Sequence, residues 1–403
     1  MDYMEKIKKF VASKKFTLVL SFVGLYLLAT GVSLGIFSYL SKDAGLSLLG
    51  GDLEDARSKI SDDMPRTEEC PINGDKFTKI EEDIWQKRRP VTAVIENHTD
   101  SRPPSGLSFA DVVYEAVAEG GITRFLSVFY CRAAAADVKI APVRSARVHY
   151  VNWAAEYGKY PIFMHVGGAN DYSGSGDTIE EANALALLAT LGWRVPRGND
   201  FDTIYDSGFP VFWRNYERLD KEVATEHTMM ASLDAAYKQA ETRGFGDKHE
   251  GKAWDKTFRP WKFADGEAVS SPDATEISLG FWDDYSEYNV VWKYDSETNS
   301  YLRENNGSEH IDLATNEVLS AKNVVILFVK ERGPVDRNLH MLYTTIGEGE
   351  VLIFQNGTVI EGTWEKDSRT DRTLVFDDQG KEVSFVRGNI WFEAVPSGNE
   401  VDY

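Results

Sequence analysis

The chain has 403 residues, of which 42% are hydrophobic and 27% charged, and its formal net charge at pH 7 is −20. Such an acidic balance is unfavourable for binding the phosphate backbone of nucleic acids, so we exclude nucleic acid as a partner. The length is sufficient for two globular domains.

The first 41 residues have the pattern of a membrane anchor. Residues 1–15 carry five lysines against Asp2 and Glu5, and residues 16–41 contain no charged side chain. This uncharged run is longer than the roughly 20 residues that a helix needs to cross a bilayer. The positive-inside bias predicts a cytoplasmic tail at 1–15, a single-pass transmembrane anchor in the cell membrane at 16–41, and an extracytoplasmic body. A cleaved signal peptide is the alternative, although its apolar core is usually shorter.

A polar segment follows the predicted anchor. Residues 42–84 are rich in Gly, Asp and Glu and lack sustained periodicity, which is typical of a tether. Cys70 and Cys131 both lie in the predicted extracytoplasmic part, where a disulfide can persist. A Cys70–Cys131 bridge and two free thiols both remain open.

Residues 85–245 combine strand and helix patterns and are predicted to form a layered α+β domain. Runs of β-branched and aromatic residues indicate strands at 91–96, 111–118, 122–131 and 161–166. Helices are predicted at 145–157, 178–191 and 225–243, and the last two end at Gly192 and Gly244.

The pattern changes after this domain. Residues 246–274 are predicted to be a connector, and residues 275–403 a smaller, mostly-β domain of short strands and tight turns. Strands are predicted at 290–294, 324–329, 340–346, 351–354, 359–364, 372–376, 383–386 and 390–395. Asn356-Gly357, between two of them, is the strongest short hairpin signal in the chain. The predicted fold class is therefore α+β, behind one transmembrane helix.

Several motifs occur in order along the body. They are RRPVTAVIENHTDSRPPSGLSFADVVYEAVAEGGITRFLSVFY, APVRSARVHYVNWAAEYG and FMHVGGAN, then HIDLATNEVLSAKNVVILFV, GEGEVLIFQNGTVIEGTWEK and IWFEAVP. Over roughly residues 85–400 the chain resembles the YerB-like bacterial lipoprotein family. The resemblance implies a two-domain envelope protein with no established activity. Members of that family are typically held by a lipidated cysteine, which residues 25–45 lack, so the helix at 16–41 is expected to replace the lipid.

The sharpest geometric prediction concerns a hairpin around Gly120-Gly121. A two-residue turn at these glycines places Glu115 and Glu119 on one face of the sheet, with Arg124 diagonal to both. This arrangement is either an ion-pair ladder or a carboxylate pair oriented by an arginine. Such a pair suits general acid–base catalysis or the binding of a polyol. Glu115 and Glu119 are therefore candidate catalytic residues, and Arg124 is a candidate ligand-binding residue.

Two further arginines lie at a predicted helix start. Pro142 and Ser145 mark that start, so Arg144 and Arg147 are placed at the positive end of the helix dipole. Cations are disfavoured there unless an anion is close. That anion is either an internal carboxylate, Glu115 or Glu119, or an external carboxylate or phosphate.

Polar residues also gather at two predicted strand ends. His165 ends the strand at 161–166 and is followed by Gly167 and Gly168, which permit close approach of a ligand or another backbone. His165 is a candidate acid–base group, although a histidine at a strand end is more often structural. Glu96 and His98, at the end of the strand at 91–96, complete the candidate ligand-binding residues.

No sequence motif indicates a metal or a cofactor. The seven histidines show neither H-E-x-x-H nor H-x-H spacing, and neither cysteine belongs to a C-x-x-C pair. The glycine motifs that bind nucleotide phosphates are also missing from the sequence. Three hypotheses remain: a binding module for peptidoglycan or another envelope protein, a cell-wall hydrolase or lyase that uses Glu115 or Glu119, and a structural assembly factor. The binding module is our leading hypothesis.

Overall fold

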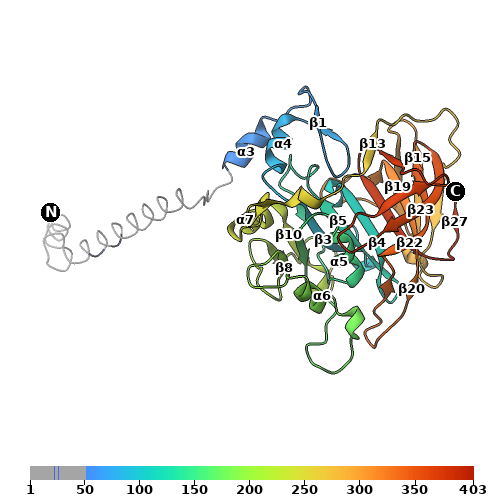
Figure 1. The fold of residues 1–403 in the computed structure, drawn as a ribbon. Helices are drawn as coiled ribbons and strands as arrows, with labels where there is room; N and C mark the ends of the chain where they lie inside the picture. Colours follow the sequence, from blue (N-terminus) through green and yellow to red (C-terminus); the bar gives the residue numbers. More distant parts are fainter. Residues whose placement is uncertain (1–21, 23–25, 27–50) are drawn as a thin grey trace, which may run out of the picture. The chain divides into compact units, whose positions relative to one another are not determined.

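The computed structural model describes Phe22, Tyr26 and residues 51–403 (Figure 1). The chain divides into two compact units, Met1–Lys59 and Ile60–Tyr403. The first unit contains helix α3 (Gly51–Ser58). The predicted anchor at 16–41 lies outside the described residues, apart from Phe22 and Tyr26. Within the part of the chain that is described, no helix combines the length and the apolar character needed to span a bilayer.

The second unit is mixed α+β with mostly strands, and a ten-stranded sheet is its centre. The strand order is β24-β23-β22-β19-β26-β4-β5-β3-β7-β8. In chain order these strands are β3 (Val91–Glu96), β4 (Val112–Glu119), β5 (Ile122–Phe129), β7 (Ile162–His165), β8 (Asp200–Asp202), β19 (Asn323–Val329), β22 (Gly347–Gln355), β23 (Thr358–Lys366), β24 (Leu374–Asp377) and β26 (Ile390–Pro396). Strands from both predicted domains, 85–245 and 275–403, therefore share one sheet.

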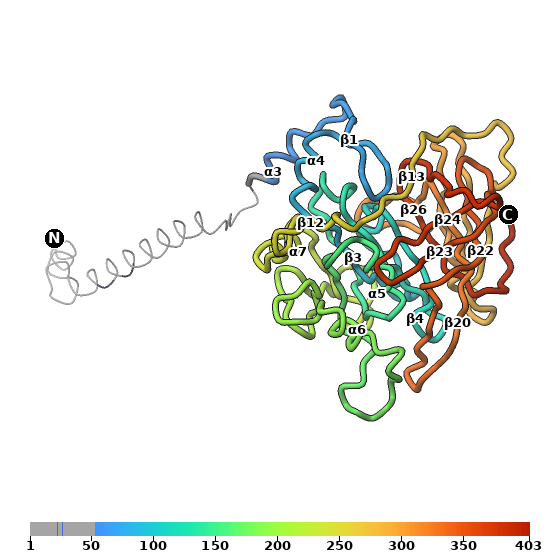
Figure 2. The backbone as a smooth tube through the Cα atoms, viewed as in Figure 1, coloured from blue at the N-terminus to red at the C-terminus, as the bar shows by residue number. Residues whose placement is uncertain are grey.

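The two halves of the chain join at the parallel pair of β26 and β4, where Glu393 lies opposite Glu115. On its other side β26 pairs in parallel with β19. The backbone tube shows the C-terminal strands drawn in red beside β4 in cyan (Figure 2). β19 reads NVVILFV and is buried along almost its whole length, as expected for a strand covered on both faces.

A second sheet covers one face of the first. Its order is β17-β16-β15-β14-β27, with β18 beside β16. Its strands are β14 (Glu276–Leu279), β15 (Val290–Asp295), β16 (Ser300–Asn305), β17 (Ser308–Glu309), β18 (Ser320–Ala321) and β27 (Val401–Asp402). Trp292 of β15 contacts Trp391 of β26 edge to face, with ring centroids 5.2 Å apart. Its indole N–H donates to Glu393 Oε1 at 3.0 Å, so the sheets are joined by both apolar and polar contacts.

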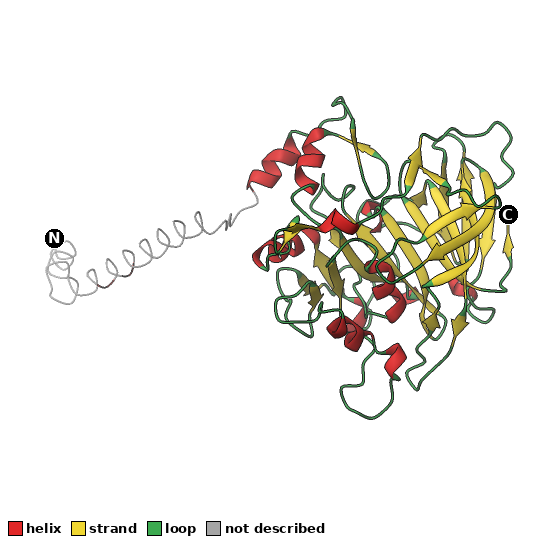
Figure 3. Cartoon of the chain, in the orientation of Figure 1, coloured by secondary structure: helices red, strands yellow, loops and turns green. Residues whose placement is uncertain are grey.

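Helices are concentrated on the side of the N-terminal strands, as the colouring by secondary structure shows (Figure 3). They are α4 (Lys79–Trp85), α5 (Val148–Ala154), α6 (Ala184–Thr190) and α7 (Leu233–Thr242). α5 packs on β4: Trp153 stacks on Tyr114 at 5.1 Å, and the Tyr150 hydroxyl donates to the Ala116 carbonyl at 2.8 Å. α5 therefore covers the face of the large sheet opposite to the second sheet.

The predicted helix at 225–243 is wrong in its first part. A 3₁₀ turn, η4 (Thr225–His227), and strand β10 (Met229–Ser232) precede α7. β10 pairs with β9 (Phe212–Arg214) and β6 (Lys139–Ile140), so tertiary pairing overrides local helix propensity there. Ser232 then caps α7, because its hydroxyl accepts the N–H of Ala235 at 3.2 Å.

Short elements complete the unit. They are β1 (Glu68–Glu69), β2 (Lys76–Phe77), β11 (Lys248–His249), β12 (Lys252–Ala253), β13 (Lys262–Ala264), β20 (Glu331–Arg332), β21 (Leu342–Tyr343) and β25 (Ser384–Val386). The structure differs from the predicted tether at 42–84, because residues from Ile60 onward belong to the second unit. The predicted hairpin at Asn356-Gly357 is confirmed: both residues have positive φ, 58° and 81°, and Gln355 pairs with Thr358.

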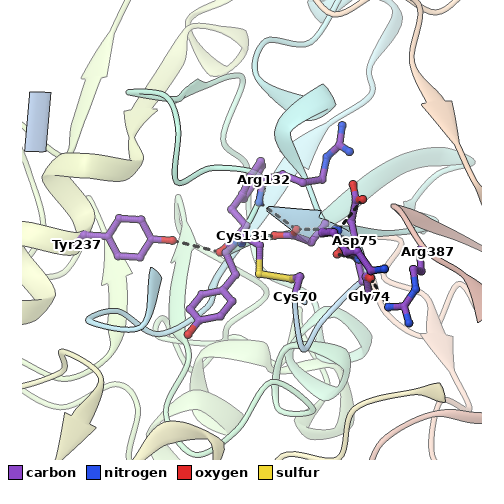
Figure 4. The surroundings of a disulfide bond; sticks show 12 residues. Cys70, Gly74, Asp75, Cys131, Arg132, Tyr237 and Arg387 are labelled. Atoms are coloured by element: carbon purple, nitrogen blue, oxygen red, sulfur yellow. Dashed lines mark hydrogen bonds between the residues drawn. A yellow bond between two sulfur atoms is a disulfide. The ribbon is translucent and has the colours of Figure 1, made fainter. Parts of the chain in front are cut away.

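Cys70 and Cys131 form a disulfide, with their Cα atoms 6.0 Å apart (Figure 4). Asp111 fixes the loops on both sides of the bridge. Its carboxylate accepts the backbone N–H of Cys131 at 3.0 Å and the side-chain amide of Asn73 at 2.9 Å. Arg387 adds a contact from the C-terminal half, donating to the Gly74 carbonyl at 2.7 Å. Of the two alternatives, a disulfide or two free thiols, the structure therefore contains the disulfide.

Candidate functional site

A β-bulge in the β4–β5 hairpin decides where its carboxylates point. Glu119 pairs with Ile122 as predicted, but the register shifts between Val117 and Glu119. Glu115 therefore lies opposite Phe125, one residue earlier than predicted. Because a one-residue shift reverses the face that a side chain takes, Glu115 and Glu119 lie on opposite faces of the sheet. The predicted carboxylate pair on one face is wrong.

On the helix-bearing face, two arginines hold Glu119. It forms ion pairs with Arg124 and with Arg147, the latter at 2.6 Å between Nη2 and Oε2. Arg147 is the residue that precedes α5, so the predicted arginine at a helix start has an internal anion. Burial opposes the ionisation of Glu119, but the charges of Arg124 and Arg147 outweigh it and lower the pKa of the carboxyl to about 2. Glu119 is therefore an ionised, fixed group.

A second polar cluster on this face is centred on Glu96. Its carboxylate accepts from Arg144 Nε at 2.8 Å and lies 2.8 Å from His227 Nδ1. The ring of His98 stacks on that of His227, with centroids 4.8 Å apart and an interplanar angle of 23°. Burial, followed by the charge of His227, lowers the pKa of His98. The structure thus brings Glu96 and His98 together with Arg144 and His227, and the anion of Arg144 is Glu96 instead of the expected Glu115, Glu119 or external anion.

Glu115 lies on the other face, between the two sheets. It accepts from the Thr123 hydroxyl at 2.6 Å and pairs with Arg303 of β16. Arg303 Nε is also 3.8 Å from Glu393 Oε1, and all three charged side chains are fully buried. Burial, followed by the negative charge of Glu115, raises the pKa of Glu393 well above its ordinary range. Sequence reasoning missed Arg303 and Glu393, because no local pattern reveals which strands pair across the core.

His165 is buried and bonded through both ring nitrogens. Nε2 lies 2.5 Å from Asp200 Oδ1, and Nδ1 lies 2.6 Å from the Gly167 carbonyl. Burial disfavours the charged ring, but the carboxylate of Asp200 outweighs it and raises the pKa of His165. The backbone N–H of Gly167 donates to Asp202 at 2.8 Å, and a Cβ on Gly168 would meet internal side chains. These three candidate residues thus make internal contacts.

Two related family descriptions match the chain. The “Protein of unknown function (DUF3048) N-terminal domain” matches residues 77–246, and the DUF3048 C-terminal domain matches residues 279–392. The chain belongs to this two-domain, YerB-like family. It is 28% identical over 340 residues to “Putative lipoprotein YerB” of Bacillus subtilis (strain 168), an alignment that covers 83% of this chain and 88% of that protein.

The solved fold of the family agrees with the sequence match. The crystal structure of YerB from Bacillus subtilis superposes with a TM-score of 0.64 at 26% identity. The superposition covers 84% of this chain and 100% of that chain. The YerB-like resemblance of the sequence motifs is therefore confirmed.

A cavity of about 330 Å³ in this YerB-like chain lies beside the turn between β4 and β5. It is lined by Phe281, Trp282, Asp283, Asp284, Tyr285, Glu331, Pro396 and Asn399. The turn touches the wall of the cavity, because a Cβ on Gly121 would meet the Tyr285 ring. The Trp282 indole N–H donates to Glu331 at 3.0 Å, and its ring meets Tyr285 edge to face at 5.5 Å. The lining thus contains aromatic rings and three carboxylates, with no cationic side chain.

Two other cavities have different linings. One of about 460 Å³ lies between the ends of β19 and β22 and includes Lys330 and Glu348. One of about 130 Å³ includes the buried Glu156 and Arg372. The predicted ligand-binding residues line none of these three cavities.

Proposed function

We propose that this protein is a membrane-associated, extracytoplasmic binding module of the cell envelope, with the glycan of peptidoglycan as its ligand. Membership of the YerB-like family and the word lipoprotein in its relative's name support the location. The Cys70–Cys131 disulfide supports it as well, because such bonds persist in oxidising compartments outside the cytoplasm.

The proposed means of attachment is the helix at 16–41, with residues 1–15 in the cytoplasm. The uncharged run and the preceding lysines support this topology. Intact mass of the protein purified from membranes tests it. A mass that includes residues 1–41 is expected, whereas a chain that starts after residue 41 rules out the anchor and leaves the extracytoplasmic location in place.

The cavity beside the β4–β5 turn carries the proposed binding function. A sugar ring presents an apolar face, which stacks on an aromatic side chain such as Trp282, and hydroxyl groups, which donate to carboxylates. Asp283 and Asp284 are exposed, and neither has a hydrogen bond or ion pair to another described residue. Their oxygens are thus available to the hydroxyl groups of a glycan.

The same geometry argues against the catalytic alternative. Glu115 is fully buried and bonded to Thr123 and Arg303, so a glycosidic oxygen has no access to it. Glu119 is ionised at neutral pH, because Arg124 and Arg147 lower its pKa, and it therefore has no proton to donate as a general acid. We therefore favour binding over hydrolysis.

Sedimentation with purified peptidoglycan tests the proposed function on residues 60–403, the second compact unit. A variant with Trp282→Ala, Asp283→Asn and Asp284→Asn is expected to bind at least tenfold more weakly, about 1.4 kcal/mol. Comparing intact peptidoglycan with glycan strands stripped of their peptides identifies the part that is bound.

A matched control carries Asp62→Asn and Asp63→Asn. These are adjacent exposed aspartates, so the charge change from the two aspartates is the same. Equal binding by the wild type, the cavity variant and the control contradicts the proposal. Binding to intact peptidoglycan alone, with none to the stripped strands, assigns the ligand to the peptide instead of the glycan.

A further inference from the structure

Two histidines and an aspartate that are far apart in the sequence meet at the edge of the helix-bearing face. His98 precedes the 3₁₀ turn η1 (Thr99–Ser101), which contains Asp100, and His227 ends η4. One ring nitrogen of each histidine and one carboxylate oxygen of Asp100 lie within 4.8 Å of one another. No sequence motif reveals this group, because 128 intervening positions separate the two histidines in the chain.

Hydrogen bonds orient both histidine rings. His227 Nδ1 faces the Glu96 carboxylate at 2.8 Å, so this nitrogen carries the proton and Nε2 has the lone pair. His98 Nδ1 accepts the backbone N–H of Asp100 at 3.1 Å, so a metal ion bound through this nitrogen replaces that hydrogen bond. A histidine bonded through its second nitrogen to a carboxylate is the usual arrangement around a metal ligand.

The Glu96 carboxylate that faces His227 is itself held in place. Glu96 is buried, and Arg144 Nε donates to its other oxygen at 2.8 Å. The charge around the group is net negative, because Glu96, Asp100 and the exposed Glu226 outnumber the two nearby cations, Arg144 and Arg218. This excess of carboxylates favours a bound cation.

The group also opens to solvent. The side chain of Asp100 is 68% exposed and that of His98 28%, whereas His227 is only 7% exposed. His98 Nδ1 is 3.9 Å from Asp100 Oδ2. Two ligands on one tetrahedral zinc ion lie roughly 3.4 Å apart, so small movements of the His98 and Asp100 side chains bring their ligand atoms to bonding distance.

We propose that His98, Asp100 and His227 form a site for a divalent transition-metal ion such as Zn²⁺, with Glu96 as the positioning residue of His227. Three protein ligands leave the fourth position to water or an external group. This site is separate from the cavity at Trp282 and goes beyond the glycan-binding function.

Titration of the full chain in mild detergent, after treatment with a chelator, tests the site. Zn²⁺ is followed by calorimetry, and Co²⁺ by its visible absorption, which reports tetrahedral nitrogen and oxygen ligands. The wild type is expected to bind one equivalent. His98→Ala and Asp100→Asn are each expected to weaken binding at least tenfold, and Asp100→Asn changes an exposed residue whose loss leaves the fold intact.

His249→Ala is the matched control, because His249 is a half-buried histidine outside this group. It is expected to bind the metal like the wild type. The proposal is overturned if the wild type binds no metal, if binding survives in the double variant His98→Ala, Asp100→Asn, or if His249→Ala weakens binding as much as His98→Ala does.

Discussion

Glu393 of β26 lies directly opposite Glu115 of β4, in the parallel strand pair that joins the two family domains. Both carboxyl groups are fully buried, and the guanidinium of Arg303 from the second sheet is placed beside both. One cation balances one carboxylate, so burial favours a proton on the other carboxyl. The contact between the domains therefore depends on Arg303 and on pH.

Arg303→Met is expected to lower the free energy of unfolding by about 3–5 kcal/mol, because it leaves two buried carboxyl groups without a cation. Urea unfolding of residues 60–403 measures the change. Arg332→Met is the control, since Arg332 forms an ion pair with Glu181 in which both side chains are more than 60% exposed. Its expected cost is below about 1 kcal/mol. Similar small losses in both variants would show that the buried pair contributes little.

Removing the disulfide tests the link between the N-terminal loop and β5. Cys70→Ser with Cys131→Ser frees a loop whose ends are 61 positions apart, and the expected loss of stability is about 4 kcal/mol. Mass spectrometry checks the bond directly: the wild type should take up two alkyl groups only after reduction. Alkylation without a reductant would mean that the thiols are free.

Local patterns predict most strands of the large sheet but not their long-range pairing, and they miss β14 and β16 of the second sheet. β3 is found at the predicted residues 91–96, because a run of β-branched and apolar side chains suits a strand buried on both faces. The segment 225–232 contains Met and Ala, which are good helix formers, and was wrongly predicted to be helical. Its pairing with β9 leaves no signal in the local sequence.

The candidate site was predicted only in part for the same reason. Glu96 and His98 lie at the end of the same predicted strand, so their proximity is readable from the chain order, whereas the pairing of Arg144 with Glu96 is not. The bulge between Val117 and Glu119 is a one-residue irregularity that no periodicity reveals. It was enough to place Glu115 on the opposite face, against an arginine from the other family domain.

Glu119→Gln should change the acid limb of the stability curve. The pKa of Glu119 falls from an ordinary 4.5 to about 2 in the folded protein, so its contribution is complete above 4.5 and is lost as the pH falls toward 2. The variant is expected to be less stable at pH 7 by at most about 3 kcal/mol. This difference should shrink between pH 4.5 and pH 2.

Chemical unfolding of both proteins across that pH range provides the measurement. Glu348→Gln, at an exposed position, is the control and should follow the wild type at every pH. A difference between Glu119→Gln and the wild type that stays constant down to pH 2 would contradict the role of the two arginines.

Glu393→Gln should change the pH dependence of stability in the opposite direction to Glu119→Gln. The pKa of Glu393 is raised well above its ordinary 4.5 by burial and by the charge of Glu115. The folded protein therefore holds a proton that the unfolded chain releases above pH 4.5, and the stability of the wild type falls as the pH rises through this range. The neutral amide of the variant has no such proton, so its decline with pH should be shallower by up to about 1.4 kcal/mol per pH unit.

Urea unfolding at intervals from pH 4.5 to pH 8 compares the two slopes, and their difference cancels the titration of all other groups. Equal slopes would mean that Glu393 is ionised in the folded protein. In that case two carboxylates would face one guanidinium in the core, and Arg303→Met should then cost more than the upper end of its expected range. The two variants together therefore assign the proton at the contact between the family domains.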